Sequence, residues 1–150
     1  MQGADCSQDP PTVHLVDDDV MVRTALRRLL QSHSYRVFAY ESAEEFLADF
    51  DNDAPGCLIL DVAMPGIGGL ELHRRLDAAG GCPPTVFISG VPDVPTCASV
   101  MRGGAVHYLA KPIDERELIR ALEQALQHDA VRRRDPHRAA SVMDPGQAGE

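Results

Sequence analysis

Short apolar runs alternate with longer amphipathic stretches along most of this 150-residue chain. The apolar runs are rich in Val, Ile and Leu and are bounded by polar residues, Gly or Pro. This pattern is typical of strands that are buried on both faces of a sheet. We expect the strands at residues 13–16, 35–39, 57–61, 85–88 and 105–109.

Between these runs, apolar residues recur every three or four positions, as on the inner face of a helix that packs on a sheet. A first helix is expected from about Val22. Its arginines fall on the solvent side of the helix: Arg23, Arg27 and Arg28. A second helix opens with Ser42 and Glu45, a capping-box pair in which each side chain accepts a hydrogen bond from the other residue's backbone N–H. The loop at 52–56 ends it.

Three further helices follow the later strands. The third begins at about Gly69, the fourth runs from Val94 with Met101 on its inner face, and the fifth begins at about Asp114. Beyond His128 the sequence becomes rich in Arg, Pro, Gly and Gln, which indicates a tail rather than a core element. We therefore expect a disordered lead-in at 1–11, one folded domain at 12–128 and a flexible tail or linker start at 129–150.

Five strands that alternate with five helices through short turns predict a parallel α/β sheet with helices on both faces. The expected fold is the flavodoxin-like (βα)5 doubly wound sheet with strand order 2-1-3-4-5. In that order the switch point lies between strands 1 and 3. Asp17 and Asp18 follow strand 1 and Asp61 ends strand 3, so we expect these acids on either side of the switch point.

Composition disfavours several classes of protein. The net charge of -9 disfavours a nucleic-acid or anionic-membrane surface, because phosphates would be repelled. The four cysteines form no Cys-x-x-Cys pair, which indicates a reducing compartment without a disulfide framework. The chain shows neither a signal-peptide pattern nor an apolar run of about 20 residues, so we expect a cytoplasmic protein that does not enter a membrane.

The strand-end acids suggest a metal site with a nucleophile. Carboxylates gathered in one crevice repel each other unless one is protonated or a cation lies among them. Oxygen ligands suit Mg²⁺, which Asp17 and Asp18 would anchor. Asp61 would give one oxygen to the metal and use the other to attack phosphorus, forming an aspartyl-phosphate.

Two later strand ends supply groups that would stabilise the charge on a phosphoryl group. Lys111 adds a cation and Ser89 a hydroxyl. Taken alone, each has a plainer interpretation: Lys111 as a surface lysine, and Ser89 as the cap of the fourth helix. Tyr108 is equally consistent with a half-buried strand residue.

Together, Asp17-Asp18, Asp61, Ser89 and Lys111-Pro112 resemble the receiver domain of two-component response regulators, of the CheY type, over roughly residues 12–128. Further motifs resemble the FixJ branch, whose members usually carry a LuxR-type helix-turn-helix after the receiver: Ser42–Leu47, Asp93-Val94-Pro95 and Gly104-Ala105-Val106. Here the strand-4 hydroxyl is Ser rather than the commoner Thr.

The resemblance implies that Asp61 is the phosphoacceptor and that the backbone carbonyl of Ala63 joins the acids in holding Mg²⁺. It also implies that Ser89 and Tyr108 form a switch that opens the face made by helix 4, strand 5 and helix 5. The implied partners are a sensor histidine kinase and a second copy of the chain. The implied role is a cytoplasmic signalling module, tied to transcription regulation, that catalyses only its own phosphorylation and autodephosphorylation.

The alternative is a receiver-like scaffold that acts without phosphorylation, although such domains lose one or more of the five residues. A phosphatase with an aspartyl nucleophile would carry a second acid at position 63, which is Ala. A nucleotide-binding protein would need a phosphate-cradling loop after strand 1, where this chain has Asp17, Asp18 and Asp19.

Overall fold

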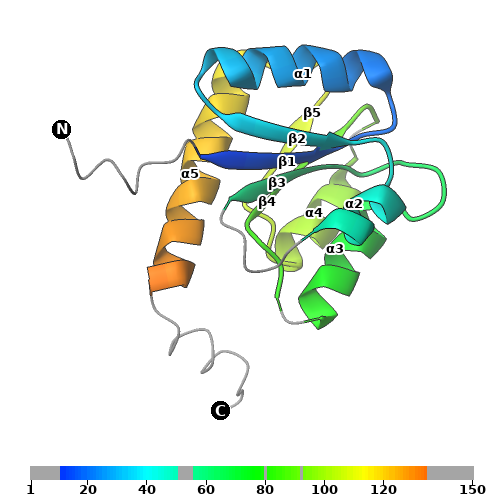
Figure 1. The fold of residues 1–150 in the computed structure, drawn as a ribbon. Coiled ribbons are helices and arrows are strands. Elements are labelled where there is room, and N and C mark those ends of the chain that lie inside the picture. The colour runs from blue at the N-terminus through cyan, green and yellow to red at the C-terminus, as the bar shows by residue number, and fades with distance from the viewer. Residues whose placement is uncertain (1–10, 51–55, 80, 92, 135–150) are drawn as a thin grey trace.

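A computed structural model of the chain describes residues 11–50, 56–79, 81–91 and 93–134. The expected lead-in falls outside these ranges except for Pro11, as do nearly all of the loop at 52–56 and positions 135–150 of the expected tail. Five strands alternate with five helices, as predicted (Figure 1). The strands are β1 (Thr12–Val16), β2 (Arg36–Tyr40), β3 (Cys57–Asp61), β4 (Thr85–Ser89) and β5 (His107–Ala110). The helices are α1 (Val20–Ser32), α2 (Ala43–Asp49), α3 (Gly69–Ala78), α4 (Val94–Arg102) and α5 (Glu115–Arg134).

The strands form one parallel sheet in the order β2-β1-β3-β4-β5, which confirms the predicted topology. Leu15 of β1 pairs with Ala39 on one side and with Ile59 on the other. The switch point therefore lies between β1 and β3, where the crossover connections leave the sheet in opposite directions.

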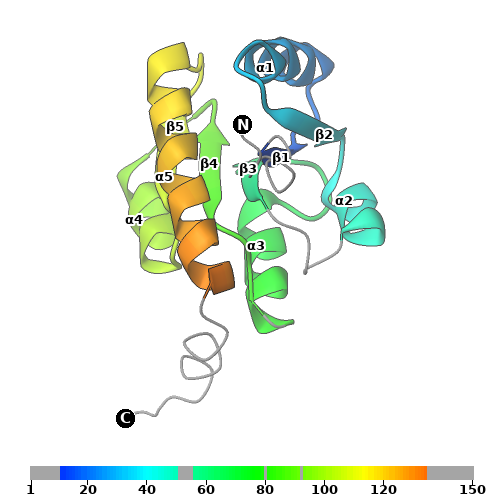
Figure 2. The same cartoon turned by 60° about the vertical axis from the view of Figure 1, so that its left-hand side comes forward.

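Helices cover both faces of the sheet (Figure 1 and Figure 2). α1 and α5 pack on one face, over a core that includes Leu15, Ile59 and Leu122. α2, α3 and α4 pack on the other, over a core that includes Phe46, Leu60 and Phe87. All five residues of β3 and of β4 are buried, which explains why these strands show as continuous apolar runs in the sequence. Among the described residues, no helix is long and apolar enough to cross a membrane.

Acidic and hydroxyl side chains set the starts of several helices. Asp19 caps α1 by accepting from the backbone N–H groups of Met21 and Val22. Ser42 caps α2 through the N–H of Glu45, which confirms half of the predicted capping box. The other half is wrong, because the Glu45 carboxylate accepts from the N–H of Glu41 instead of Ser42.

Two predictions about α4 and α5 also require correction. Met101 is 44% exposed, and Val100 fills the core position on α4. The fifth helix does not end at His128 but continues to Arg134. The Asp129 side chain is buried there and accepts a hydrogen bond from the backbone N–H of Gly56 at 3.1 Å. A charged residue in a polar stretch is thus part of the packed helix.

Candidate functional site

The carboxylates of Asp17, Asp18 and Asp61 meet at the switch point, at the carboxyl ends of β1 and β3. One carboxylate oxygen from each lies within 4.8 Å of the others. Asp17 is fully buried, Asp61 is 3% exposed and Asp18 is exposed at the rim. The sequence therefore correctly predicts that these acids come together at one edge of the sheet.

Gly69 explains how the backbone after β3 can turn back so tightly beside this cluster. A Cβ atom at Gly69 would lie 2.3 Å from the backbone oxygen of Asp61, a distance that no side chain could occupy. The first turn of α3 therefore packs directly against the strand end that presents the Asp61 carboxylate.

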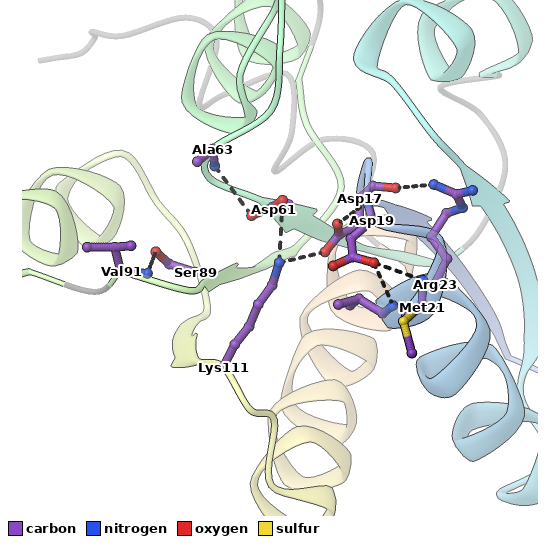
Figure 3. A network of polar contacts seen from close by, with 10 residues as sticks. Asp17, Asp19, Met21, Arg23, Asp61, Ala63, Ser89, Val91 and Lys111 are labelled. Carbon is purple, nitrogen blue, oxygen red and sulfur yellow. Dashed lines mark hydrogen bonds and ion pairs between the residues drawn. The ribbon is translucent and has the colours of Figure 1, made fainter.

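Lys111, just after β5, reaches across the sheet edge to both buried acids (Figure 3). Its Nζ lies 3.0 Å from Oδ2 of Asp17 and 3.5 Å from Oδ2 of Asp61. Burial alone would lower the pKa of Lys111, but the contact with Asp17 and the charges of Asp17 and Asp61 raise it above its ordinary value. Lys111 is therefore a fixed cation of the site and not a freely solvated surface lysine.

One lysine does not neutralise the cluster. Burial, followed by the charge of Asp17, raises the pKa of the Asp61 carboxyl to about 6, although Lys111 and the N–H of Ala63 oppose the rise. Oδ2 of Asp17 is buried, and its contact is with the ammonium of Lys111. Three clustered carboxylates with a single lysine to balance their charge fit a hard divalent cation such as Mg²⁺.

Asp61 and Ala63 are linked locally. The backbone N–H of Ala63 donates to Oδ1 of Asp61 at 3.3 Å, so the turn after β3 orients one carboxylate oxygen and leaves Oδ2 facing Lys111 (Figure 3). The role of the Ala63 carbonyl remains a prediction.

Ser89 ends β4 beside the acids and is 3% exposed. Its Oγ accepts from the backbone N–H of Val91 at 3.1 Å, whereas Asp93 caps α4. The plainer interpretation of Ser89 as the cap of that helix is therefore wrong. Tyr108 lies on β5 opposite Phe87 of β4 and is half-buried, and its hydroxyl is buried without a hydrogen-bond partner.

The helical periodicity predicts Arg23 on the solvent side of the first helix, and this prediction is wrong. Its Nη1 donates to the backbone oxygen of Asp17 at 2.7 Å. Helical periodicity gives the direction of a side chain around the helix axis, but it does not show that the first turn of α1 lies against the end of β1. The available signal was the position of Arg23 four residues after Asp19, one helical turn beyond the acids.

The parallel five-stranded fold, with clustered acids and a lysine at its switch point, defines a receiver-type α/β domain. The family model of the response regulator receiver domain matches residues 13–123. The chain belongs to this family, and it is therefore a signalling domain rather than a metabolic enzyme. The predicted resemblance is confirmed.

Similar proteins agree with this assignment. The response regulator protein TodT of Pseudomonas putida F1 is 37% identical over 132 residues, covering 88% of this chain and 58% of TodT. The transcriptional regulatory protein FixJ of Rhizobium meliloti is 38% identical over 117 residues, covering 78% of this chain and 57% of FixJ. The chain thus spans less than two thirds of the length of these relatives.

Solved structures show the same fold. The response regulator StyR superposes with a TM-score of 0.81 at 40% identity, covering 89% of this chain and 68% of that structure. FixJ-N superposes with a TM-score of 0.73 at 36% identity, covering 85% of this chain and 97% of that structure.

Proposed function

We propose that this chain is the phosphoacceptor receiver of a two-component response regulator. Asp61 takes a phosphoryl group from a phosphohistidine of a sensor kinase in a reaction that requires Mg²⁺. The observation that carries this proposal is the position of Asp61. Its carboxylate is buried at the sheet edge, clustered with two further carboxylates, and 3.5 Å from a lysine amine.

Asp17, Asp18 and Asp61, with the carbonyl of Ala63, are the groups that would hold the cation. When bound, Mg²⁺ supplies positive charge to the phosphoryl oxygens and lowers the repulsion between carboxylates. The clustering of the three carboxylates, with one lysine to balance their charge, supports this assignment.

In the transfer, an oxygen of Asp61 forms the new bond to phosphorus while the N–P bond of the phosphohistidine breaks. The electron pair of that bond returns to the imidazole of the donor. Lys111 is protonated and faces Asp61, so it can stabilise the charge on the phosphoryl oxygens without giving up its proton. The Ser89 hydroxyl, at the neighbouring strand end, can donate a hydrogen bond to the same group.

The added charge would then favour a second conformation of the domain. Ser89 would exchange its bond with the Val91 N–H for one with the phosphoryl group, and Tyr108 would follow inward. The surface of α4, β5 and α5 would then favour a homodimer or an output partner. Because similar proteins include a transcriptional regulatory protein, we propose transcription regulation in the cytoplasm as the output, without direct nucleic-acid binding by this chain and without membrane contact.

The test is the intact mass of the protein after incubation with acetyl phosphate and Mg²⁺, for wild type beside Asp61→Asn. We expect one added phosphoryl group in wild type, none in Asp61→Asn, and none in wild type when EDTA removes the metal. Slow loss of the label from the isolated protein would report autodephosphorylation.

Two results would contradict the proposal. Labelling of Asp61→Asn would show that another residue accepts the phosphoryl group. A wild type that gains no mass from acetyl phosphate or from a phosphorylated histidine-kinase core would favour the scaffold alternative.

A further inference from the structure

Arg23 differs from the other arginines of α1. Arg27 and Arg28 are exposed, whereas the Arg23 side chain is only 18% exposed. Figure 3 shows its guanidinium turned toward the backbone oxygen of Asp17. A side chain held in this way loses hydration and conformational freedom, so its contacts have to compensate for both.

Arg23 holds the acidic turn at residues 17–19 at two points. Its Nη1 donates to the backbone oxygen of Asp17 at 2.7 Å, and its own backbone N–H donates to the backbone oxygen of Asp19 at 3.0 Å. Nη2 also lies 3.9 Å from Oε1 of Glu41 in the β2–α2 connection. Because a charged donor makes a stronger hydrogen bond than a neutral one, the guanidinium contact is the firmest of these.

The other polar atoms of Asp17 are already engaged. Its backbone N–H donates to the oxygen of Tyr40 at 3.1 Å, and Oδ1 accepts from the N–H of Asp19 at 2.9 Å. Figure 3 shows its carbonyl pointing to Arg23 and its carboxylate pointing to Lys111. Removing the guanidinium would therefore release the side of Asp17 that lies opposite its carboxylate.

We propose that Arg23 is a positioning residue for the acidic cluster. By holding the carbonyl of Asp17, it presents the carboxylates of Asp17 and Asp18 to the divalent cation. The inference rests on the proposed Mg²⁺ requirement. Arg23 itself touches neither the cation nor the phosphoryl group, so it acts only through the turn.

The first measurement is Mg²⁺ affinity by calorimetric titration of the full chain. Arg23→Met places an unbranched apolar side chain at this position and removes the guanidinium. We expect its affinity to fall about 10- to 100-fold, the range found when groups behind metal ligands are removed. Arg27→Met, on the exposed side of the same helix, is the matched control and should bind as wild type does. Asp18→Ala gives the reference for the loss of a ligand.

The second measurement separates positioning from general packing. The rate of labelling by acetyl phosphate is measured against Mg²⁺ concentration. For Arg23→Met we expect the half-saturating Mg²⁺ concentration to rise while the rate at saturation stays near that of wild type. Arg23→Lys should restore part of the Mg²⁺ affinity, because it returns the charge without the two-pronged donor.

An Mg²⁺ affinity of folded Arg23→Met within twofold of wild type would overturn the inference, and so would a drop in the saturated rate with an unchanged Mg²⁺ requirement. If Arg23→Met does not fold, Arg23→Lys is scored in its place, and wild-type affinity in that variant overturns the inference. A wild type that binds no Mg²⁺ would overturn the proposed function as well, so the two failures are distinguishable.

Discussion

The two faces of the sheet are built from different kinds of side chain. Under α1 and α5 the buried residues are Val, Leu, Ile and Ala, with one cysteine. Under α2, α3 and α4 the core adds the rings of Tyr40, Phe46 and Phe87. His14 is buried on this second face, with its ring centroid 5.9 Å from that of Phe46 and 5.8 Å from that of Phe50.

The polar groups differ in the same way. Both ring nitrogens of His14 and the hydroxyl of Tyr108 are buried on the second face without hydrogen-bond partners. Each such group costs about 1–3 kcal/mol relative to a satisfied one. The native packing of this face is therefore favoured by a smaller margin than that of the other face. Ser89 lies two residues after Phe87 on β4 and so points to the same face. We call the face under α1 and α5 the aliphatic face and the face under α2, α3 and α4 the aromatic face. The aliphatic face is suited to remain fixed, and the aromatic face is suited to rearrange.

The largest effect is expected from a substitution in the core of the aliphatic face. Ile59→Ala removes a fully buried side chain from β3 on the aliphatic face. We expect the free energy of unfolding to fall by about 2–5 kcal/mol, because the close-packed surroundings cannot collapse into the cavity. Urea denaturation measures this loss, and a change below about 1 kcal/mol would show that this face is not rigidly packed.

A smaller effect is expected where α5 contacts Gly56, just before β3. Asp129→Ala leaves the N–H of Gly56 without this acceptor and should lower the free energy of unfolding by about 1–3 kcal/mol. Gln124→Ala, an exposed site on the same helix, is the control. Equal stabilities of the two variants would indicate that the folded domain ends near His128, as the sequence predicts.

The smallest effect concerns the aromatic face and depends on pH. Burial lowers the pKa of His14 below its ordinary 6.5, although the nearby charge of Asp49 opposes the shift. The unfolded chain therefore binds a proton at His14 more readily than the folded chain does. The stability contributed by neutral His14 is fully present above pH 6.5 and is lost as the pH falls below it.

The measurement compares urea unfolding of wild type and His14→Phe between about pH 7.5 and about pH 5.5. Wild type should lose more stability, by at most about 1.4 kcal/mol per pH unit for one proton. Tyr40, whose hydroxyl donates to Asp49, is present in both proteins and cancels in the comparison. Identical pH dependence would show that His14 is protonated without cost.

The sequence predicts most of the sheet because its signal is local. Residues 57–60 are apolar without interruption, so β3 is read correctly as a strand buried on both faces. The acids of the site follow from topology, since parallel strands bring Asp17 and Asp61 to the same edge. Lys111 is found in the same way, as the residue after β5.

What the sequence does not predict depends on tertiary contacts. Asp129 looks like a tail residue until α5 packs it against the start of β3. Val100 is buried in the position expected for Met101, because one position around a helix decides burial and the two side chains are similarly hydrophobic. Arg23 becomes part of the site through the path of its long side chain to Asp17, which periodicity alone does not give.

The length of α5 has a mechanical consequence. Its 20 residues form a rod of about 30 Å that begins next to the loop of Lys111 and passes Gly56 at the opposite edge of the sheet. The rod is buried against the sheet along its length through Leu118 and Leu122, and Asp129 holds it at Gly56. A displacement of its first turn would therefore move the whole rod, and the shift would be carried to the other end of the domain instead of being absorbed by bending.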